Sequence, residues 1–330
     1  MKSSHNHSRR FYRQINPAEG MVYFTVKIKE TDLWVAVDYG SYTEDLAAQL
    51  EDYIWSKRRE LEALIREVPA FYYTLQPFVL DNRHSGFATV PALEMIRAGN
   101  RVGVGPMAAV AGSFAQLAGE FLLERVEEVI VENGGDIFLK VDKPCRVGVY
   151  AGDSPLSGKV ALQISPEDTP LGVCTSSGKV GPSYSRGQAD AVVVLSPSTP
   201  LADAAATALG NMVSRGSDFE TGDCADGDCI NGECKNDDCS NDDSKTGTYE
   251  NGACENGAYD NGVSKTGTCE NSACVNGVSK AGICHNGISE NDLENILHYS
   301  QQFENIEGVL IICGDKMAAR GNLKLCPAGQ

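Results

Sequence analysis

The 330-residue chain has no long hydrophobic run. No apolar stretch approaches the roughly 18 residues of a membrane-spanning helix, and Ser113, Gln116 and Glu120 interrupt the Ala-rich segment Met107–Leu123. Residues Met1–Arg13 are polar and lead into no apolar signal-peptide core. These absences predict a cytoplasmic protein that does not enter a membrane.

Positive charge is scarce as well. The net charge is −17, and residues 223–292 alone hold 14 acidic residues against four lysines. Nucleic-acid binding needs clustered Lys and Arg to contact phosphates, so the charge argues against a nucleic-acid partner. The one basic cluster, Lys57-Arg58-Arg59, lies in a helical pattern, and we interpret it as a solvated helix face.

Cysteine is infrequent outside one segment. Eight of the 12 cysteines fall within residues 223–292, which leaves Cys145, Cys174, Cys313 and Cys326 for the rest of the chain. Four scattered cysteines without a secretory signal indicate reduced thiols and not a disulfide framework.

Residues 223–292 follow a five-residue period in which Cys, Ser or Tyr recurs before pairs such as Asn-Gly. The segment contains no Leu, Phe, Trp or Met, so it has little to bury, and repeated turn pairs without strands favour coil. We therefore predict a disordered insertion over 218–292 in a surface loop between a core of residues 1–217 and a completing segment 293–330. The alternative is metal or thiol chemistry at Cys224, Cys229, Cys234 and Cys239, whose spacing is at the edge of that of zinc sites.

The remaining pattern predicts an α+β fold, because strands come in adjacent groups between long helices. The expected strands are 23–28, 33–37, 128–131, 137–141, 147–150, 160–164, 191–195 and 309–313. The expected helices are 46–68, 108–126, 200–213 and 293–303.

Two glycine-rich segments are candidates for ligand binding. Val104–Gly112 is a Gly-rich turn that opens a helix, where free backbone N–H groups would suit a phosphate. Taken alone, the segment favours the alternative, in which its small residues allow close helix packing. Glu132–Asp136 reads as a tight hairpin with an acid on each side of Asn-Gly-Gly.

Two further segments carry oxygen donors. Val173–Lys179 is rich in hydroxyl groups and is interpreted as a loop that could bind phosphate or ribose. Its Cys174 is either a thiol nucleophile or, more commonly for such a residue, a small buried hydrophobe. Asp203 and Thr207 are four residues apart on one helix face, an arrangement that suits Mg²⁺. The alternative is that Asp203 only complements the helix dipole.

The order of these four segments resembles the ApbE family of FAD:protein FMN transferases. That resemblance implies a single ApbE-like domain likened to a duplicated T-fold, with Mg²⁺ and FAD or a related nucleotide as cofactors. It implies loops that hold the ligand and a metal-binding Asp and Thr in the last helix. The implied ligand-binding residues are Gly105, Met107, Glu132, Asn133, Gly134, Gly135, Asp136, Thr175, Ser176, Ser177 and Gly178, and the implied metal ligands are Asp203 and Thr207.

The chain is identified more specifically as resembling the UPF0280 branch, through the same segments together with Phe11-Tyr12-Arg13 and Lys29–Leu33. That branch implies a role in sulfur assimilation into homocysteine in anaerobes. The chain departs from ApbE proteins in two places. Ala111-Gly112 stands where those proteins usually have Lys-Gly, and Gly181–Ser185 lacks the His of their His-Ile-x-Asp-Pro segment.

Three hypotheses follow. The first is a protein that binds a phosphorylated or flavin-type ligand with Mg²⁺, the second is a working FMN transferase, and the third is a non-catalytic scaffold. The expected partner is a small molecule, while a homo-oligomer and partner proteins of sulfur assimilation stay open.

Overall fold

The computed structural model describes residues 20–179, 187–213, 229–230, 233–234 and 288–328. Its main feature is an eight-stranded sheet in which every neighbouring pair of strands is antiparallel. The strands, in sheet order, are β1 (Met21–Ile28), β2 (Thr31–Asp38), β3 (Val129–Asn133), β4 (Asp136–Lys140), β7 (Leu171–Ser176), β8 (Ala191–Ser196), β11 (Gly308–Cys313) and β12 (Lys316–Gly321).

The sheet contains the same connectivity twice. In the first half, helices follow β1–β2 and precede β3–β4, and in the second half helices follow β7–β8 and precede β11–β12. The α+β class and the duplicated arrangement are therefore confirmed. The helices are α1 (Leu46–Glu67), α2 (Ala70–Tyr73), η2 (Asn82–Phe87), α3 (Val90–Val102), η3 (Pro106–Ala109), α4 (Val110–Leu123), η4 (Pro166–Asp168), α5 (Thr199–Met212), α6 (Glu290–Tyr299) and η5 (Ser300–Gln302).

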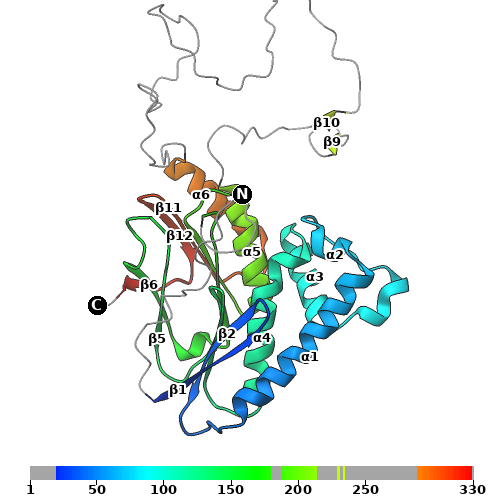
Figure 1. Cartoon of the computed structure of the whole chain (residues 1–330). Coiled ribbons are helices and arrows are strands. Elements are labelled where there is room, and N and C mark those ends of the chain that lie inside the picture. Colours follow the sequence, from blue (N-terminus) through cyan, green and yellow to red (C-terminus); the bar gives the residue numbers. More distant parts are fainter. Residues whose placement is uncertain (1–19, 180–186, 214–228, 231–232, 235–287, 329–330) are drawn as a thin grey trace, which may run out of the picture. The chain divides into compact units, whose positions relative to one another are not determined.

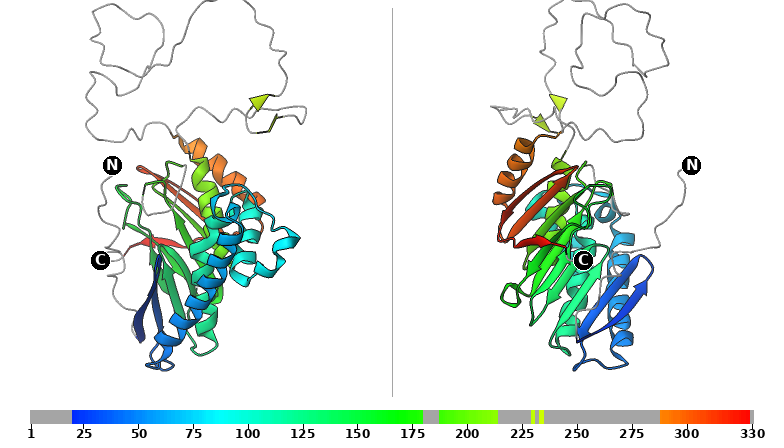
Figure 2. Two further views of the ribbon diagram at one scale, coloured as in Figure 1. Left: turned by 45° about the vertical axis from the view of Figure 1, so that its right-hand side comes forward. Right: turned by 90° about the vertical axis from the view of Figure 1, so that its left-hand side faces the viewer.

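The two faces of the sheet are covered differently. Helices α1, α4 and α5 lie on one face, where α4 contacts β3 and β4 and α5 contacts β7 and β8 (Figure 1). Figure 2 shows the helices on that face from two further sides. A separate apolar cluster, which includes Leu139, Leu171 and Leu310, covers the other face together with a three-stranded sheet. That sheet has the order β13 (Leu325–Pro327), β6 (Val160–Ile164), β5 (Cys145–Gly148).

The central strands are buried on both faces. All six residues of β8 and all six of β11 are buried, which explains why both read as continuous apolar runs. Helix α5 is almost wholly buried too, and its alanines allow it to lie close to its neighbours. The sheet and α5 therefore form a rigid base on which polar side chains at the strand ends can be held.

The segment Pro106–Leu123, which comprises η3 and α4, is the one stretch of the described residues that is long and apolar enough to cross a membrane. This holds by length and composition only. In the structure 56% of that window is buried, because α4 packs against the sheet and α5. The helix is thus part of the core, and the predicted cytoplasmic location stays a prediction.

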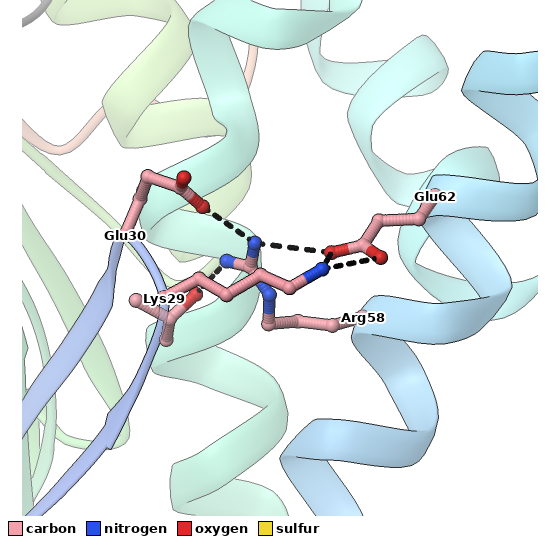
Figure 3. Close-up of polar contacts among 5 residues, drawn as sticks. Lys29, Glu30, Arg58 and Glu62 are labelled. Atoms are coloured by element: carbon pink, nitrogen blue, oxygen red, sulfur yellow. Dashed lines mark hydrogen bonds and ion pairs between the residues drawn. The ribbon is translucent and has the colours of Figure 1, made fainter.

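Helix α1 is fastened to the β1–β2 turn by a charge network (Figure 3). The Arg58 guanidinium donates to Glu30 Oε2 at 2.7 Å and to the hydroxyl of the buried Thr31 at 2.5 Å. Lys29 Nζ donates to both carboxylate oxygens of Glu62, at 2.7 and 2.8 Å. The side chain of Arg58 is only 14% exposed, so the interpretation of Lys57-Arg58-Arg59 as a solvated face is wrong for Arg58.

The expected elements are largely present, with several differences. Helix α3 and the strands β7, β12 and β13 were not expected, so 309–313 is not the last core strand. Helix α6 begins at Glu290, three residues before the predicted 293, because Ser289 and Asp292 form a capping box.

The described residues before 214 and after 287 pack into one unit. Strands β9 (Cys229–Ile230) and β10 (Glu233–Cys234) belong to a second. The predicted disordered insertion and the candidate cysteine site lie almost wholly outside the described residues, and both stay predictions.

Candidate functional site

The first part of the site is the β3–β4 hairpin turn. Asn133 pairs with Asp136 across it, and Gly134 and Gly135 have φ angles of +73° and +108°, which glycine adopts without strain. The Gly135 N–H donates to Glu132 Oε1 at 2.7 Å. The expected Asn-Gly-Gly turn is confirmed, and Glu132, one of its two flanking acids, stabilises the turn through this hydrogen bond.

The second part is the contact between α4 and α5. A Cβ on Gly112 would lie 2.6 Å from Thr199 O and 2.8 Å from Asp203 Cβ, so only glycine lets the two helices approach this closely. At this point Asp203 Oδ2 accepts a hydrogen bond of 2.8 Å from the Gly112 N–H. The Asp203 carboxylate therefore caps the first turn of α4, whereas Ser198 caps its own helix α5.

The hairpin, α4, α5 and the end of β7 converge. Asn133 Nδ2 donates to Ala111 O at 3.0 Å, which ties the hairpin to the first turn of α4. The Thr175 backbone N–H favours the charged form of the Asp136 carboxyl group and lowers its pKa. Cys174 Sγ donates to Thr199 O at 3.4 Å. Residues from all four predicted segments thus meet at one place, which we call the carboxylate site (Asp136, Cys174 and Asp203).

Burial dominates the electrostatics of the carboxylate site. It raises the pKa of Asp136 from 3.8 to about 7, with the Glu132 charge adding to the effect, while the Cys174 thiol and the Thr175 N–H act in the opposite direction. Burial and the Asp136 charge raise the pKa of Asp203 well above its usual value. Two acids in such an environment need a proton or a cation.

Cys174 is a buried thiol and not an activated one. It is fully buried, and burial together with the charges of Asp136 and Asp203 raises its pKa well above the ordinary value. A nucleophilic cysteine needs the opposite shift, because the thiolate is the reactive form. The structure favours the interpretation of Cys174 as a small buried hydrophobe.

The donors at the site fit a hard divalent cation. Asp136 Oδ1 is buried and accepts no hydrogen bond from the described residues, although buried oxygen atoms usually have a partner. Within the same part of the chain, no group of three or more His, Cys, Asp or Glu could hold a metal ion. A cation would therefore need hydroxyl, carbonyl or ligand oxygens besides carboxylates. Thr207, one turn after Asp203 and half-buried, offers a hydroxyl on that helix face.

The predicted hydroxyl-rich loop is wrong in part. Thr175 and Ser176 form the end of strand β7, and only Ser177, Gly178 and Lys179 of the predicted segment follow it. A Cβ on Gly178 would lie 1.9 Å from Gly187 O, so the backbones at these two glycines are in contact. The Ser177 hydroxyl accepts a hydrogen bond of 3.1 Å from the Lys179 N–H.

The Gly-rich turn differs from its expected form. The N–H of Gly105 donates to Leu75 O at 3.0 Å, and that of Ala108 donates to Gly105 O at 3.1 Å. Together with the Gly112 N–H, these donors already have protein acceptors, which weakens the case for phosphate binding by this turn. Gly105 lies against the backbone of Thr74. Met107 is half-buried beside the apolar core. Helix η3, which includes Met107, contacts α5, the helix that carries Asp203.

Sequence reasoning missed an ion pair between the segment that follows β7 and the residue that precedes β8. The Lys179 ammonium lies 2.6 Å from Oδ1 of Asp190, which is 1% exposed, and Asp190 Oδ2 accepts a 2.6 Å hydrogen bond from the Gly314 N–H. The available signal was an acid placed directly before the apolar run of β8.

Comparisons with known proteins identify the family to which this α+β fold and its carboxylate site belong. The family model described as AbpE bacteria matches residues 13–221, and the chain belongs to this family. A UPF0280 protein of Methanocella arvoryzae is 45% identical over 190 residues, covering 57% of this chain and 73% of the relative. A UPF0280 protein of Methanosarcina acetivorans is 41% identical over 193 residues, covering 58% and 73%.

Among solved structures, the apo form of the flavinyl transferase ApbE from Pseudomonas stutzeri is 17% identical, with a TM-score of 0.38. It covers 58% of this chain and 84% of that chain. A similarity of this size adds nothing to the family assignment.

Proposed function

We propose that the protein binds a phosphorylated ligand of the flavin or nucleotide type together with Mg²⁺ at the carboxylate site. The observation that carries the proposal is the pair of buried acids, Asp136 and Asp203, with one carboxylate oxygen lacking a partner. A bound cation would compensate the negative charge of both acids and would give the unpartnered carboxylate oxygen a ligand to bind. The flavin or nucleotide part of the proposal comes from the resemblance to ApbE proteins.

By the resemblance, Asp203 and Thr207 would hold the cation, and the partnerless Oδ1 of Asp136 offers a further oxygen donor. Mg²⁺ prefers oxygen ligands and is commonly bound by one or two carboxylates together with phosphate oxygens of the substrate. When bound, it would neutralise phosphate charge next to an otherwise acidic site. The protein itself fixes the Asp203 carboxylate through the Gly112 N–H and fixes the hairpin through Asn133.

A thermal-shift titration with FAD, FMN and ADP, each with and without Mg²⁺, tests this proposal. We expect a Mg²⁺-dependent rise of several degrees, since a ligand at 100 times its Kd stabilises by about 2.7 kcal/mol. Asp203→Asn keeps the shape and an acceptor for Gly112 but removes the charge, so the rise should disappear. Asp142→Asn, at an exposed acid bonded to Lys140, is the matched control and should keep the rise.

No stabilisation of the wild-type protein by any of the three ligands would contradict the proposal and favour a scaffold without a ligand. A rise that persists in Asp203→Asn would place the ligand elsewhere. Covalent flavin on a target protein after incubation with FAD and Mg²⁺ would establish the stronger hypothesis of FMN transfer.

The physiological role implied by the UPF0280 resemblance is support of sulfur assimilation into homocysteine. Deletion of the gene should then cause a growth defect at low sulfide that homocysteine or methionine relieves. A deletion strain that grows normally under these conditions would contradict the role without affecting the binding proposal.

A further inference from the structure

The four candidate segments contain a single cationic side chain. Segments 104–112, 131–136 and 201–211 have no Lys or Arg, and 173–179 has only Lys179. The carboxylate site is acidic, and an anionic ligand would be repelled without compensating positive charge. Lys179 is therefore the one residue of these segments that could attract a phosphate directly.

Lys179 is held in place by a buried acid. Its ammonium lies 2.6 Å from Asp190 Oδ1, and the other oxygen of Asp190 is fixed by the Gly314 N–H. The Asp190 side chain is 1% exposed, whereas that of Lys179 is 20% exposed. An ammonium group has three donors. One of them forms the hydrogen bond to the buried Asp190, and the others can donate to a ligand on the accessible side.

The position of Lys179 relative to α5 follows from backbone contacts. Gly178 touches Gly187, and Gly187 packs on the end of α5, where a Cβ would lie 1.7 Å from Gly210 O. Gln188 N donates to Val213 O at 2.7 Å. The Lys179 segment thus lies near the C-terminal end of α5, while Asp203 lies in the first half of that helix and Thr207 between the two.

The spacing suits a ligand with more than one anionic group. Thr207, the second proposed cation ligand, is three residues from Gly210, which corresponds to about 4.5 Å along a helix. Adjacent phosphates of a diphosphate can cover a distance of this order, so one phosphate could meet the cation on the Thr207 side and the next could reach Lys179.

We propose that Lys179, fixed by Asp190, binds a phosphate of the ligand whose Mg²⁺ is bound at Asp203 and Thr207. This inference rests on the proposed function, because it concerns the same ligand. The competing explanation is a purely structural pair in which Lys179 complements the negative end of the α5 dipole. The two explanations differ in whether the lysine distinguishes phosphorylated from unphosphorylated ligands.

The experiment compares affinities for FAD against riboflavin and for ADP against adenosine, all with Mg²⁺. Lys179→Met should weaken FAD or ADP binding roughly tenfold, as expected for loss of a hydrogen bond to a charged group. Binding of riboflavin or adenosine should change less than about twofold, and Lys179→Arg should restore most of the affinity for the phosphorylated ligand. Lys140→Met, which removes the lysine of another Lys–Asp pair, is the matched control and should bind like the wild type.

Unchanged FAD and ADP affinity in Lys179→Met would overturn the inference, and so would an equal loss for phosphorylated and unphosphorylated ligands. If Lys179→Met does not fold, Lys179→Gln keeps a donor for Asp190 and tests the same charge. A wild-type protein that binds none of the four probes would refute the proposed function. A wild-type protein that binds them, with Lys179 variants that bind equally well, would refute only the inference about Lys179.

Discussion

At the residue scale, Asp136 makes the stability of the ligand-free protein depend on pH. Its pKa is about 7 in the folded chain, against 3.8 for the unperturbed group, because burial disfavours the charged form. An acid with a raised pKa binds more protons in the folded chain than in the unfolded chain. Its contribution to the free energy of unfolding is therefore complete below about pH 4 and is lost as pH rises through 7.

We expect this contribution to amount to at most about 4 kcal/mol, shared with the neighbouring acid Asp203. Urea unfolding in the presence of EDTA between pH 4.5 and 8 measures it. The Asp136→Asn variant should show a flatter dependence than the wild type, and the difference between the two curves isolates the residue. Parallel curves would show that Asp136 is ionised in the folded protein throughout this range.

The same residues show what the sequence could predict about the site. The spacing of Asp203 and Thr207 placed both on one helix face, and Asn-Gly-Gly predicted the hairpin that carries Asp136. The pairing of Asp203 with the first turn of α4 joins residues 91 positions apart. Nothing local in the sequence encodes that distance. The charge on Asp190 was unremarkable until the fold placed Lys179 beside it.

At the element scale, the contact between α4 and α5 depends on Gly112. Gly112→Ala should destabilise the protein by about 1–3 kcal/mol, because its Cβ would meet backbone and side-chain atoms of α5 that cannot move away. Gly86→Ala, at a helical glycine with no atom within 4 Å of the added Cβ, is the control. Equal urea midpoints for the two variants would mean that α5 shifts to accommodate the methyl group.

The β1–β2 turn depends on Arg58 in the same way. Arg58→Lys should cost about 1–2 kcal/mol, because one ammonium cannot replace a planar guanidinium that contacts Glu30, Thr31 and Glu62. Hydrogen exchange of the turn amides, together with chemical unfolding, measures the loss. Arg59→Lys, at the exposed neighbour on α1, should leave both unchanged.

Elements with a clear apolar period were predictable, and those without one were not. Strand β7 ends in Cys174, Thr175 and Ser176, whose small side chains are typical of a loop, although these residues pair with β8. Strand β12 has four exposed residues among six, so burial leaves only a weak pattern. Both strands are held in an extended conformation by pairing with neighbouring strands. The sequence alone does not show which strands these partners are.

At the scale of the whole molecule, one sheet is assembled from residues on both sides of 214–287. We predict that replacing 217–286 by a short Gly-Ser linker leaves the melting temperature within about 3 °C and the ligand affinity unchanged, since loop closure depends only weakly on loop length. Circular dichroism melting and the ligand titration above measure these quantities. Loss of folding would show that the segment contributes contacts to the core.

The fully buried strands β8 and β11 are paired in the sheet, yet residues 197–307 separate them in the chain. At about 5–20 residues per second, the ribosome needs on the order of 5–20 s to synthesise this interval. During that time the nascent chain holds the valine-rich β8 without the strand that covers its outer edge. Among the intervening residues, 223–292 contain no Leu, Phe, Trp or Met and are weak competitors for that edge. Because β11 is synthesised late, the edge of β8 is unpaired for this time, and the nascent chain can aggregate through that edge before β11 pairs with it.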